Sequence, residues 1–187
     1  MIYHLQITLN NVTPAIVRTV VVEDDMTLFE LHLVVQIAMG WENCHLWQME
    51  IATRVFADLE IDEYIEASDS RRILLREILP NQVGFEFEYT YDFGDDWEHN
   101  IRIDKIQQSD FGRRYPYCLS GENACPPEDC GGARGYENIL FLLKNPKHPN
   151  YEAYISDGIG EDFDATDFDM EEANSRLDIL DQIRDLM

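Results

Sequence analysis

The strongest indication of the fold lies in residues 84–106, GFEFEYTYDFGDDWEHNIRIDKI. Apolar side chains alternate here with polar ones, and this period places one set on a single face of a strand: Phe85, Phe87, Tyr89, Tyr91 and Phe93. A turn is expected at residues 94–96, Gly-Asp-Asp, and the returning segment puts a second set on one side: His99, Ile101 and Ile103. The stretch therefore predicts a β-hairpin with one face in the protein core.

The N-terminal part of the chain shows the same alternation. Residues 3–10 place four apolar side chains on one face, namely Tyr3, Leu5, Ile7 and Leu9. Residues 16–23, IVRTVVVE, follow a turn and are rich in β-branched residues, so they are expected to pair with the first strand. Residues 45–56 predict one further strand.

A helix is predicted over residues 27–39. Thr27 and Glu30 make the T-x-x-E pattern of a capping box, and Gly40 is placed to end the helix. Further helices are expected at residues 71–79, where the apolar pattern would also allow a strand, at residues 136–145 and 150–158, and from residue 169 to the C-terminal region.

These segments predict an α+β fold, with an antiparallel sheet and helices packed on one face. A chain of 187 residues with 45% hydrophobic residues can fill one core, so we expect a single compact domain over residues 1–187. An acidic loop over residues 157–172 precedes the C-terminal helix in this interpretation.

The charge of the chain points to cationic partners. Its 14 basic and 37 acidic side chains give a net charge of −23. Such a surface repels phosphate backbones, which argues against direct nucleic-acid binding. A bound metal cation or a protein partner with a basic surface suits this charge, and the acidic residues 157–172 are one place where such a partner could bind.

No run of the chain approaches the roughly 18–20 apolar residues of a membrane span, so we expect no membrane association. The first ten residues, MIYHLQITLN, do not show the basic and then apolar pattern of a signal peptide. We therefore expect a cytoplasmic protein with reduced thiols.

Three of the four cysteines lie in residues 118–132, CLSGENACPPEDCGG. Clustered cysteines in a reducing compartment favour a metal site, while buried inert thiols and a disulfide are the alternatives. The spacing C-x6-C-x4-C lacks the usual C-x2-C pair, so a metal would need a fourth ligand from elsewhere. The candidates for that ligand are His99, His45, Cys44, Asp129 and water.

Zinc is the metal that these residues would suit best, because it prefers tetrahedral thiolate and imidazole ligands. Proline and glycine in the loop limit the entropy lost when the chain closes around an ion. His99 shares a side with apolar residues and therefore points toward the core, where it could meet the loop. We accordingly predict a structural zinc site with the ligands Cys118, Cys125, Cys130 and His99.

The turn of the hairpin collects carboxylates and an imidazole within residues 92–99. Such a group could bind a divalent cation or act in acid–base chemistry, with Asp95 and Glu98 as the catalytic candidates. Asp and Gly are also common in any tight turn, so a purely structural role is the alternative. The chain contains no phosphate-binding loop and no dinucleotide fingerprint, and no nucleotide cofactor is predicted.

Four segments of the chain resemble a known family. They are T-L-x-E-L-H-x-V-x-Q-I-A-M-G-W-x-x-x-H-L (27–46), Y-T-Y-D-F-G-D-D-W-E-H (89–99), C-L-x-G-x-x-A-C-P-P-E-D-C-G-G-x-x-G-Y (118–136) and F-D-x-x-x-F-D-x-x-x-x-N-x-x-L (163–177). The family is the Ri-plasmid ORF-three-like family, named after open reading frame three of plasmid pRiA-four-b, and the resemblance runs nearly from end to end.

The resemblance implies a compact α+β domain found on plasmids and as a passenger of insertion-sequence elements, and it implies no established activity. The positions that match the family pattern are His45, Asp92, Asp95, Trp97, Glu98, His99, Cys118, Cys125, Cys130 and Tyr136. The chain departs from the family at Val17, where a tryptophan is frequent, and at Trp47, where a second histidine is frequent. Cys44 lies outside the shared pattern.

Three functional hypotheses follow. The first is a binding or accessory module associated with mobile elements, with a structural zinc site and a further candidate site around His45, Asp92, Trp97 and Tyr136. The second is a metal-dependent hydrolase in which Asp95 or Glu98 activates a metal-bound water. The third is a protein that binds a basic partner through its acidic loop. The sequence alone leaves open whether the protein is an enzyme.

Overall fold

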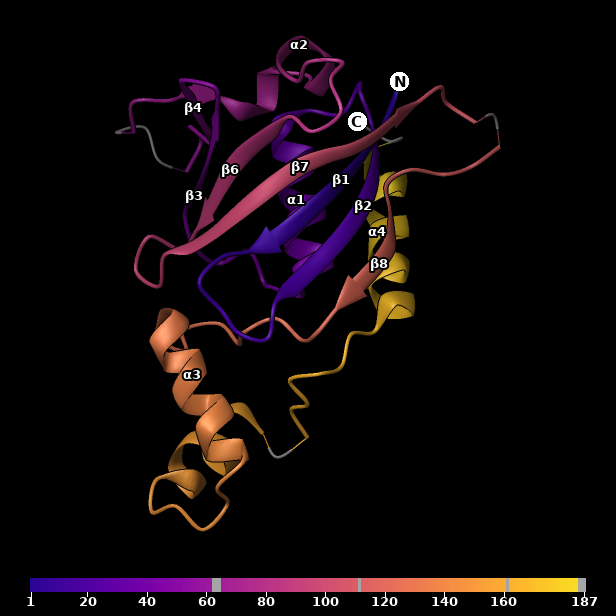
Figure 1. Cartoon of the computed structure of the whole chain (residues 1–187). Helices are drawn as coiled ribbons and strands as arrows, with labels where there is room; N and C mark the ends of the chain where they lie inside the picture. Colours follow the sequence, from indigo (N-terminus) through magenta and orange to yellow (C-terminus); the bar gives the residue numbers. More distant parts are fainter. Residues whose placement is uncertain (62–64, 111, 161, 185–187) are drawn as a thin grey trace.

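The computed structural model describes residues 1–61, 65–110, 112–160 and 162–184. In these residues the strands form one sheet of eight, in the order β5-β4-β3-β6-β7-β1-β2-β8 (Figure 1). All neighbouring strands are antiparallel except β4 and β5, which pair in parallel. The strands are β1 (Ile2–Leu9), β2 (Ile16–Glu23), β3 (Trp47–Ile51), β4 (Arg54–Ala57), β5 (Ser68–Asp69), β6 (Glu86–Tyr91), β7 (Trp97–Gln107) and β8 (Tyr117–Glu122).

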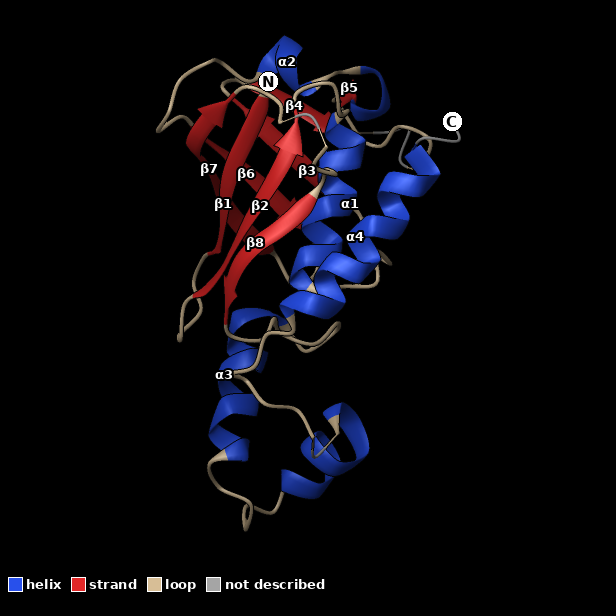
Figure 2. Ribbon diagram, turned by 90° about the vertical axis from the view of Figure 1, so that its right-hand side faces the viewer, coloured by secondary structure: helices blue, strands red, loops and turns tan. Residues whose placement is uncertain are grey.

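Two long helices cover one face of this sheet, as the sequence predicted for an α+β fold (Figure 2). These are α1 (Leu28–Met39) and α4 (Met170–Arg184), which contact each other. The short elements η1 (Ser70–Arg72) and α2 (Leu75–Ile78) lie at one end of the sheet, whereas α3 (Gly132–Leu143) and η2 (Glu152–Ile159) extend from the other end (Figures 1 and 2). The main core lies between the sheet and α1.

The predicted hairpin of residues 84–106 is formed by β6 and β7. Tyr89 pairs with His99 and Phe87 with Ile101, and all four side chains are buried. Phe93 was expected on the same face, but β6 ends at Tyr91 and the Phe93 side chain is 45% exposed. The alternation of apolar and polar residues could not reveal where β6 ends, because it continues unbroken to Phe93 although the strand ends at Tyr91.

The N-terminal hairpin and the first helix also agree with the sequence prediction. β1 and β2 pair along their full length, from Ile2 opposite Glu23 to Leu9 opposite Ile16. The capping box at the start of α1 is complete, since the side chains of Thr27 and Glu30 each accept a backbone N–H of the other residue.

Three further predicted boundaries were wrong. Residues 71–79, expected as one helix, form the short element η1 and the separate helix α2, because Ile73 and Leu74 between them are extended. Residues 45–56 form two strands, β3 and β4, because Ala52 adopts a left-handed conformation with φ of 57° and reverses the chain. The helix expected from residue 136 begins at Gly132, four residues earlier. A Cβ atom on Gly132 would lie 2.6 Å from the carbonyl oxygen of Asp95, so this glycine lets α3 start directly against the hairpin turn.

The outer edge of the sheet, β8, is closed by a side chain of α4. The amide of Asn174 accepts the backbone N–H of Cys118 at 2.7 Å and donates to the Cys118 carbonyl at 3.0 Å. The side chain thus makes both bonds that a neighbouring strand would make, and it protects an edge that could otherwise pair with another chain. Asn174 belongs to the C-terminal segment that resembles the family.

A buried arginine joins α1 to β8. Arg18 is 1% exposed, and its guanidinium donates to the carbonyl oxygens of Ala38, Val17, Glu122 and Asn123, each at 2.8 Å. The ring of Phe168 lies over the guanidinium, with 3.8 Å between the ring centre and Cζ. Burial lowers the pKa of Arg18, but these carbonyls replace the hydrogen bonds that water would supply.

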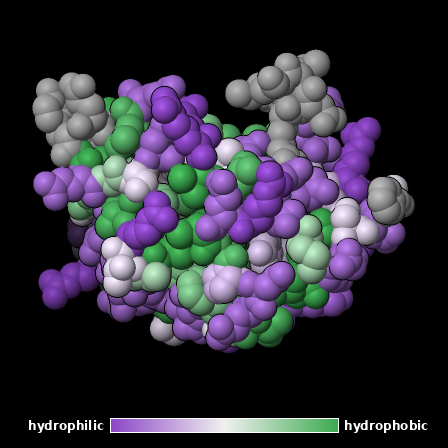
Figure 3. All heavy atoms as spheres, turned by 90° about the horizontal axis from the view of Figure 1, so that it is seen from above, coloured by the Kyte–Doolittle hydropathy of each residue, from purple (hydrophilic) through white to green (hydrophobic). Residues whose placement is uncertain are grey.

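None of the helices formed by the described residues is both long and apolar enough to cross a membrane. Seen from the end that carries α2, hydrophobic side chains gather in the middle of the surface and hydrophilic ones surround them (Figure 3).

Candidate functional site

Three loops meet at the end of the sheet where β6 turns into β7. They are residues 41–46 between α1 and β3, the hairpin turn 92–96, and the cysteine loop 123–131. The indole of Trp41 donates to the Pro126 carbonyl at 3.1 Å, and the N–H of Gly131 donates to a carboxylate oxygen of Asp95 at 3.0 Å. The sequence interpretation expected the cysteine loop beside the hairpin turn, and the bond between Gly131 and Asp95 joins these two segments.

His45 lies at the centre of this junction. Its Nε2 atom is 3.3 Å from Asp129 Oδ1, 3.7 Å from Asp92 Oδ2 and 3.9 Å from Glu128 Oε2. Nε2 is nevertheless buried and makes no hydrogen bond within the described residues, and the same is true of Glu128 Oε2. Each of the three loops contributes to this group, which we call the His45 site: His45, Asp92, Glu128 and Asp129.

The other oxygen of Glu128 is firmly held. Oε1 accepts the hydroxyl of Tyr91 at 2.9 Å and the backbone N–H of Glu42 at 2.9 Å. These two bonds orient the carboxylate, so that Oε2 faces His45. Outer hydrogen bonds of this kind are how proteins orient the ligands of metal sites.

Asp92 is positioned by the turn itself. Its backbone N–H donates to the Leu46 carbonyl at 2.9 Å, and its Oδ1 accepts the N–H of Gly94 at 2.9 Å. Oδ2 remains directed toward His45. Both Asp92 and Asp129 have positive φ, 54° and 53°, a conformation that aspartate tolerates better than most residues.

The spacing of these atoms suits a metal ion. Tetrahedral zinc with bonds of about 2.0–2.1 Å holds neighbouring N and O ligands about 3.3–3.4 Å apart. The Nε2–oxygen distances of 3.3–3.9 Å are close to that separation. The ligand atoms of His45, Asp92 and Asp129 lie within 4.8 Å of one another, and so do those of Cys44, His45 and Glu128.

The side chains that the sequence predicted as zinc ligands are not grouped in this way. Among the described residues, Cys118, Cys125, Cys130 and His99 form no set of three with ligand atoms within 4.8 Å of one another. Cys118 is buried on β8, and its thiol donates to the Ser120 carbonyl at 3.3 Å. The zinc site of these four residues stays a prediction.

All four cysteines are free thiols, and three of them are held protonated by their surroundings. Burial raises the pKa of Cys118 and Cys125, against the nearby positive charge of Arg18. Burial, together with the carboxylate of Asp95, raises the pKa of Cys130 to about 12. These values describe thiols that are poor nucleophiles.

His99 is fully buried, as its position on the apolar side of the hairpin indicated. Its Nδ1 lies 3.2 Å from the Tyr89 carbonyl, and the ring meets Trp41 edge-on with 5.2 Å between ring centres. Burial lowers the pKa of His99 to about 4, so the ring is neutral at pH 7. Its Nε2 has no hydrogen-bond partner among the described residues.

The remaining predicted residues have structural contacts. Asp95 accepts the Gly131 N–H, and Glu98 accepts the amide of Asn11 at 3.2 Å on the exposed outer face. Trp97 is buried, and Tyr136 on α3 donates to the Ala124 carbonyl at 3.4 Å, which holds the cysteine loop to that helix.

Sequence reasoning missed Glu128 as a site residue and named Asp129 only as an alternative fourth ligand. The signal lay in C-P-P-E-D-C, where two adjacent acids sit between two cysteines. The sequence interpretation was based on the thiols as ligands, although the neighbouring carboxylates are the groups that face His45. Trp47, the departure from the family pattern, is buried and stacks on His32.

Comparison with known proteins agrees with the family resemblance of the sequence motifs. The family described as plasmid pRiA4b ORF-3-like protein matches residues 1–172. The chain is 33% identical over 180 residues to an uncharacterized protein of Sinorhizobium fredii, y4hQ, covering 96% of this chain and 92% of that protein. It also resembles the crystal structure of MM3350, a protein of unknown function from Methanosarcina mazei Go1, with a TM-score of 0.83 and 33% identity over 91% of this chain and 95% of the other. The chain belongs to the plasmid pRiA4b ORF-3-like protein family.

Proposed function

We propose that the protein is a binding module whose His45 site holds a divalent metal ion, with zinc as the best fit. One observation carries the proposal. The buried Nε2 of His45 has no hydrogen-bond partner among the described residues, yet it faces three carboxylate oxygens at 3.3–3.9 Å. A buried polar atom without a partner is costly, and a bound cation would satisfy it together with Glu128 Oε2.

The metal would have a structural role. His45, Asp92 and Asp129 come from three different loops, so one ion would join the end of α1, the β6–β7 turn and the cysteine loop. Asp129 is 77% exposed and Asp92 only 10%, so an ion could enter from the Asp129 side. The net charge of −23 favours the approach of a cation.

The free thiols support our placement of the protein in the cytoplasm.

A metal-dependent hydrolase would need a free carboxylate beside a metal-bound water. Asp95 and Glu98, the predicted catalytic residues, are instead bonded to Gly131 and Asn11. The contacts of both carboxylates therefore favour the binding role over the hydrolase.

Calorimetric titration of chelator-treated protein with zinc tests the proposal. We expect one ion per chain, and weaker binding by at least a hundredfold in His45→Gln and at least tenfold in Asp92→Asn. Asp92→Asn keeps the oxygen that accepts the Gly94 N–H and removes only the charge. His148→Ala, which lies between α3 and η2 outside the site, is the matched control and should bind as wild type.

Two results would overturn the proposal. One is the absence of zinc binding to the wild type. The other is binding that survives His45→Gln and is lost in Cys125→Ser, because the ion would then belong to the cysteine loop. Thermal unfolding gives a second readout, since zinc at a hundred times its Kd should stabilise the fold by about 2.7 kcal/mol.

A further inference from the structure

Two neighbouring pockets lie at the C-terminal end of α1. The first has a volume of about 250 Å³ and the second about 320 Å³, and both are lined by Met39, Gly40 and Cys125. We call them the acidic pocket and the apolar pocket. Neither includes His45 or Asp92, although Glu128 lines the apolar pocket.

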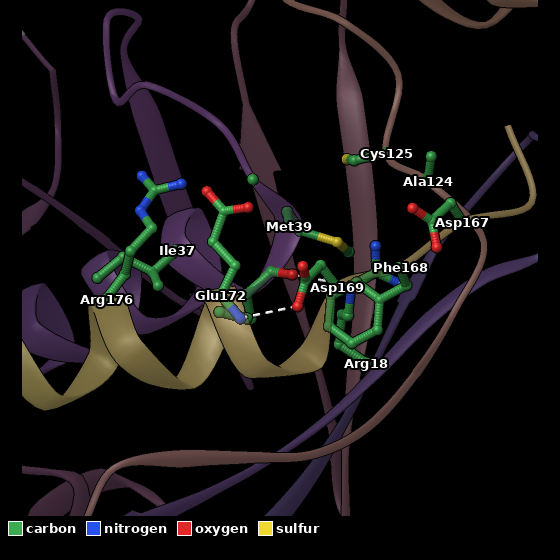
Figure 4. A pocket seen from close by; sticks show the side chains of 13 residues that line it. Arg18, Ile37, Met39, Ala124, Cys125, Asp167, Phe168, Asp169, Glu172 and Arg176 are labelled. Atoms are coloured by element: carbon green, nitrogen blue, oxygen red, sulfur yellow. Dashed lines mark hydrogen bonds between the residues drawn. The ribbon is translucent and has the colours of Figure 1, made fainter. Parts of the chain in front are cut away.

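The acidic pocket lies between the end of α1 and the start of α4. Asp167, Asp169 and Glu172 surround it, and all three are exposed (Figure 4). Arg18 also lines it, but the guanidinium of this residue already donates to four carbonyl oxygens and lies under the Phe168 ring. Among the described residues of the lining, Arg176 is the other cation, so three acids face two arginines, one of which is already bonded to carbonyls.

The apolar pocket is built differently. Its lining consists mostly of rings and aliphatic side chains, together with two acids: Trp41, Pro126, Pro127, Ile159, Phe163, Glu42 and Glu128. Trp41 and Pro126 are buried and joined by a hydrogen bond, so this wall is preformed. A preformed apolar pocket costs little ordering when it receives an apolar side chain.

We propose that these two pockets bind an extended segment of another protein, with a basic side chain in the acidic pocket and an apolar side chain in the apolar pocket. In an extended chain, residues two apart point to the same side and lie about 7 Å from each other. The two pockets share Met39, Gly40 and Cys125 in their linings, so neighbouring side chains of one segment would enter one pocket each. The partner class follows from charge, because the acidic stretch of residues 157–172 supplies the acids of the first pocket and the whole chain carries −23.

This proposal does not require a metal ion at the His45 site, although Glu128 belongs to both. In this proposal Asp167 and Glu172 bind a basic side chain of the partner, and the apolar pocket next to them binds an apolar one. A small polyamine would use the acids alone, whereas a peptide would use both pockets.

Fluorescence anisotropy with a labelled peptide, Gly-Ser-Lys-Ala-Leu-Lys-Gly, tests the proposal at low salt. The double variant Asp167→Asn with Glu172→Gln should weaken binding at least tenfold. The matched control, Glu171→Gln with Asp178→Asn, removes the same charge from residues of α4 that line neither pocket, and it should stay within twofold of wild type. Replacing the leucine of the peptide by serine should weaken binding at least fivefold.

Spermidine should displace the peptide only at concentrations far above the Kd of the peptide. The proposal is overturned if the wild type does not bind the peptide at millimolar concentration, or if both double variants lose affinity equally. It is also overturned if the serine peptide binds as well as the leucine peptide, or if spermidine competes as strongly as the peptide itself. Near-UV circular dichroism of each variant establishes that its fold is unchanged.

Discussion

Protonation of His32 is expected to make this fold sensitive to mild acid. The ring is fully buried and stacks on Trp47 with 4.0 Å between ring centres. Its Nδ1 is 2.9 Å from the Tyr89 hydroxyl and its Nε2 is 2.8 Å from Asn43 Oδ1. Because Gln36 donates to the Tyr89 hydroxyl at 2.9 Å, that hydroxyl is free to donate its own proton to Nδ1. The network therefore fits the neutral ring, protonated on Nε2.

Burial lowers the pKa of His32 from 6.5 to about 3. Between these two values the unfolded chain binds a proton that the folded protein does not bind, so stability falls as the pH is lowered from 6.5 toward 3. From pH 7.5 to pH 5.0 the difference amounts to about 2 kcal/mol for this one group. His99, whose pKa is lowered to about 4, adds a loss of about 2 kcal/mol over the same interval.

Urea unfolding followed by tryptophan fluorescence measures this effect at pH 7.5, 6.5 and 5.0. The variant His32→Gln keeps a polar side chain and does not titrate. Its stability at pH 7.5 will be lower than that of wild type, but the quantity of interest is the change with pH. Between pH 7.5 and 5.0 we expect the wild type to lose about 2 kcal/mol more than the variant.

The comparison separates the histidine from the many carboxylates, because these are common to both proteins. Parallel stability curves for wild type and His32→Gln across this range would refute the reasoning. They would mean that the ring accepts a proton in the folded protein, and hence that the buried network rearranges. His99→Gln provides an independent second test with the same expected sign.

Three further predictions concern stability. Gly121→Ala should destabilise the protein by about 1–3 kcal/mol in urea unfolding, because the new Cβ would overlap the ring of Phe168. Asn174→Ala should cost about 1–3 kcal/mol and speed amide hydrogen exchange in β8, since both backbone groups of Cys118 lose their partner. Arg18→Met should cost about 3 kcal/mol or more by thermal or urea unfolding, because the carbonyls it serves are left without a donor.

Each of these changes has a control of the same type. Gly158→Ala places a Cβ 3.5 Å from the Ala153 carbonyl, an ordinary contact, and should be nearly neutral. Asn100→Ala removes an exposed bond to Glu86, and Arg176→Met removes an exposed guanidinium, so both should change stability by less than about 0.5 kcal/mol. If a control cost as much as its test variant, the contact named for that variant would not be the cause.

Much of the fold could be predicted because its elements are encoded over short distances. The alternation in residues 84–106 predicts the β6–β7 hairpin, and the Thr27–Glu30 pair predicts the start of α1 to the residue. The errors arose where a local pattern continues past a change in chain direction, at Ala52 and after Tyr91. Periodicity reports which residues can share a face, whereas the point at which a chain turns depends on what packs against it.

The candidate site shows the limit of the sequence more clearly. Composition and charge indicated a cation, and the lack of a fourth ligand for the three clustered cysteines led to the hypothesis that the cysteine loop and the hairpin turn belong to one site. Only the tertiary structure brings a carboxylate oxygen of Asp92 to 3.7 Å and one of Asp129 to 3.3 Å from His45 Nε2. Only the structure shows that this buried Nε2 has no hydrogen-bond partner among the described residues. These residues are separated by 37 to 84 positions in the chain, so their meeting depends on how the sheet packs rather than on any local pattern.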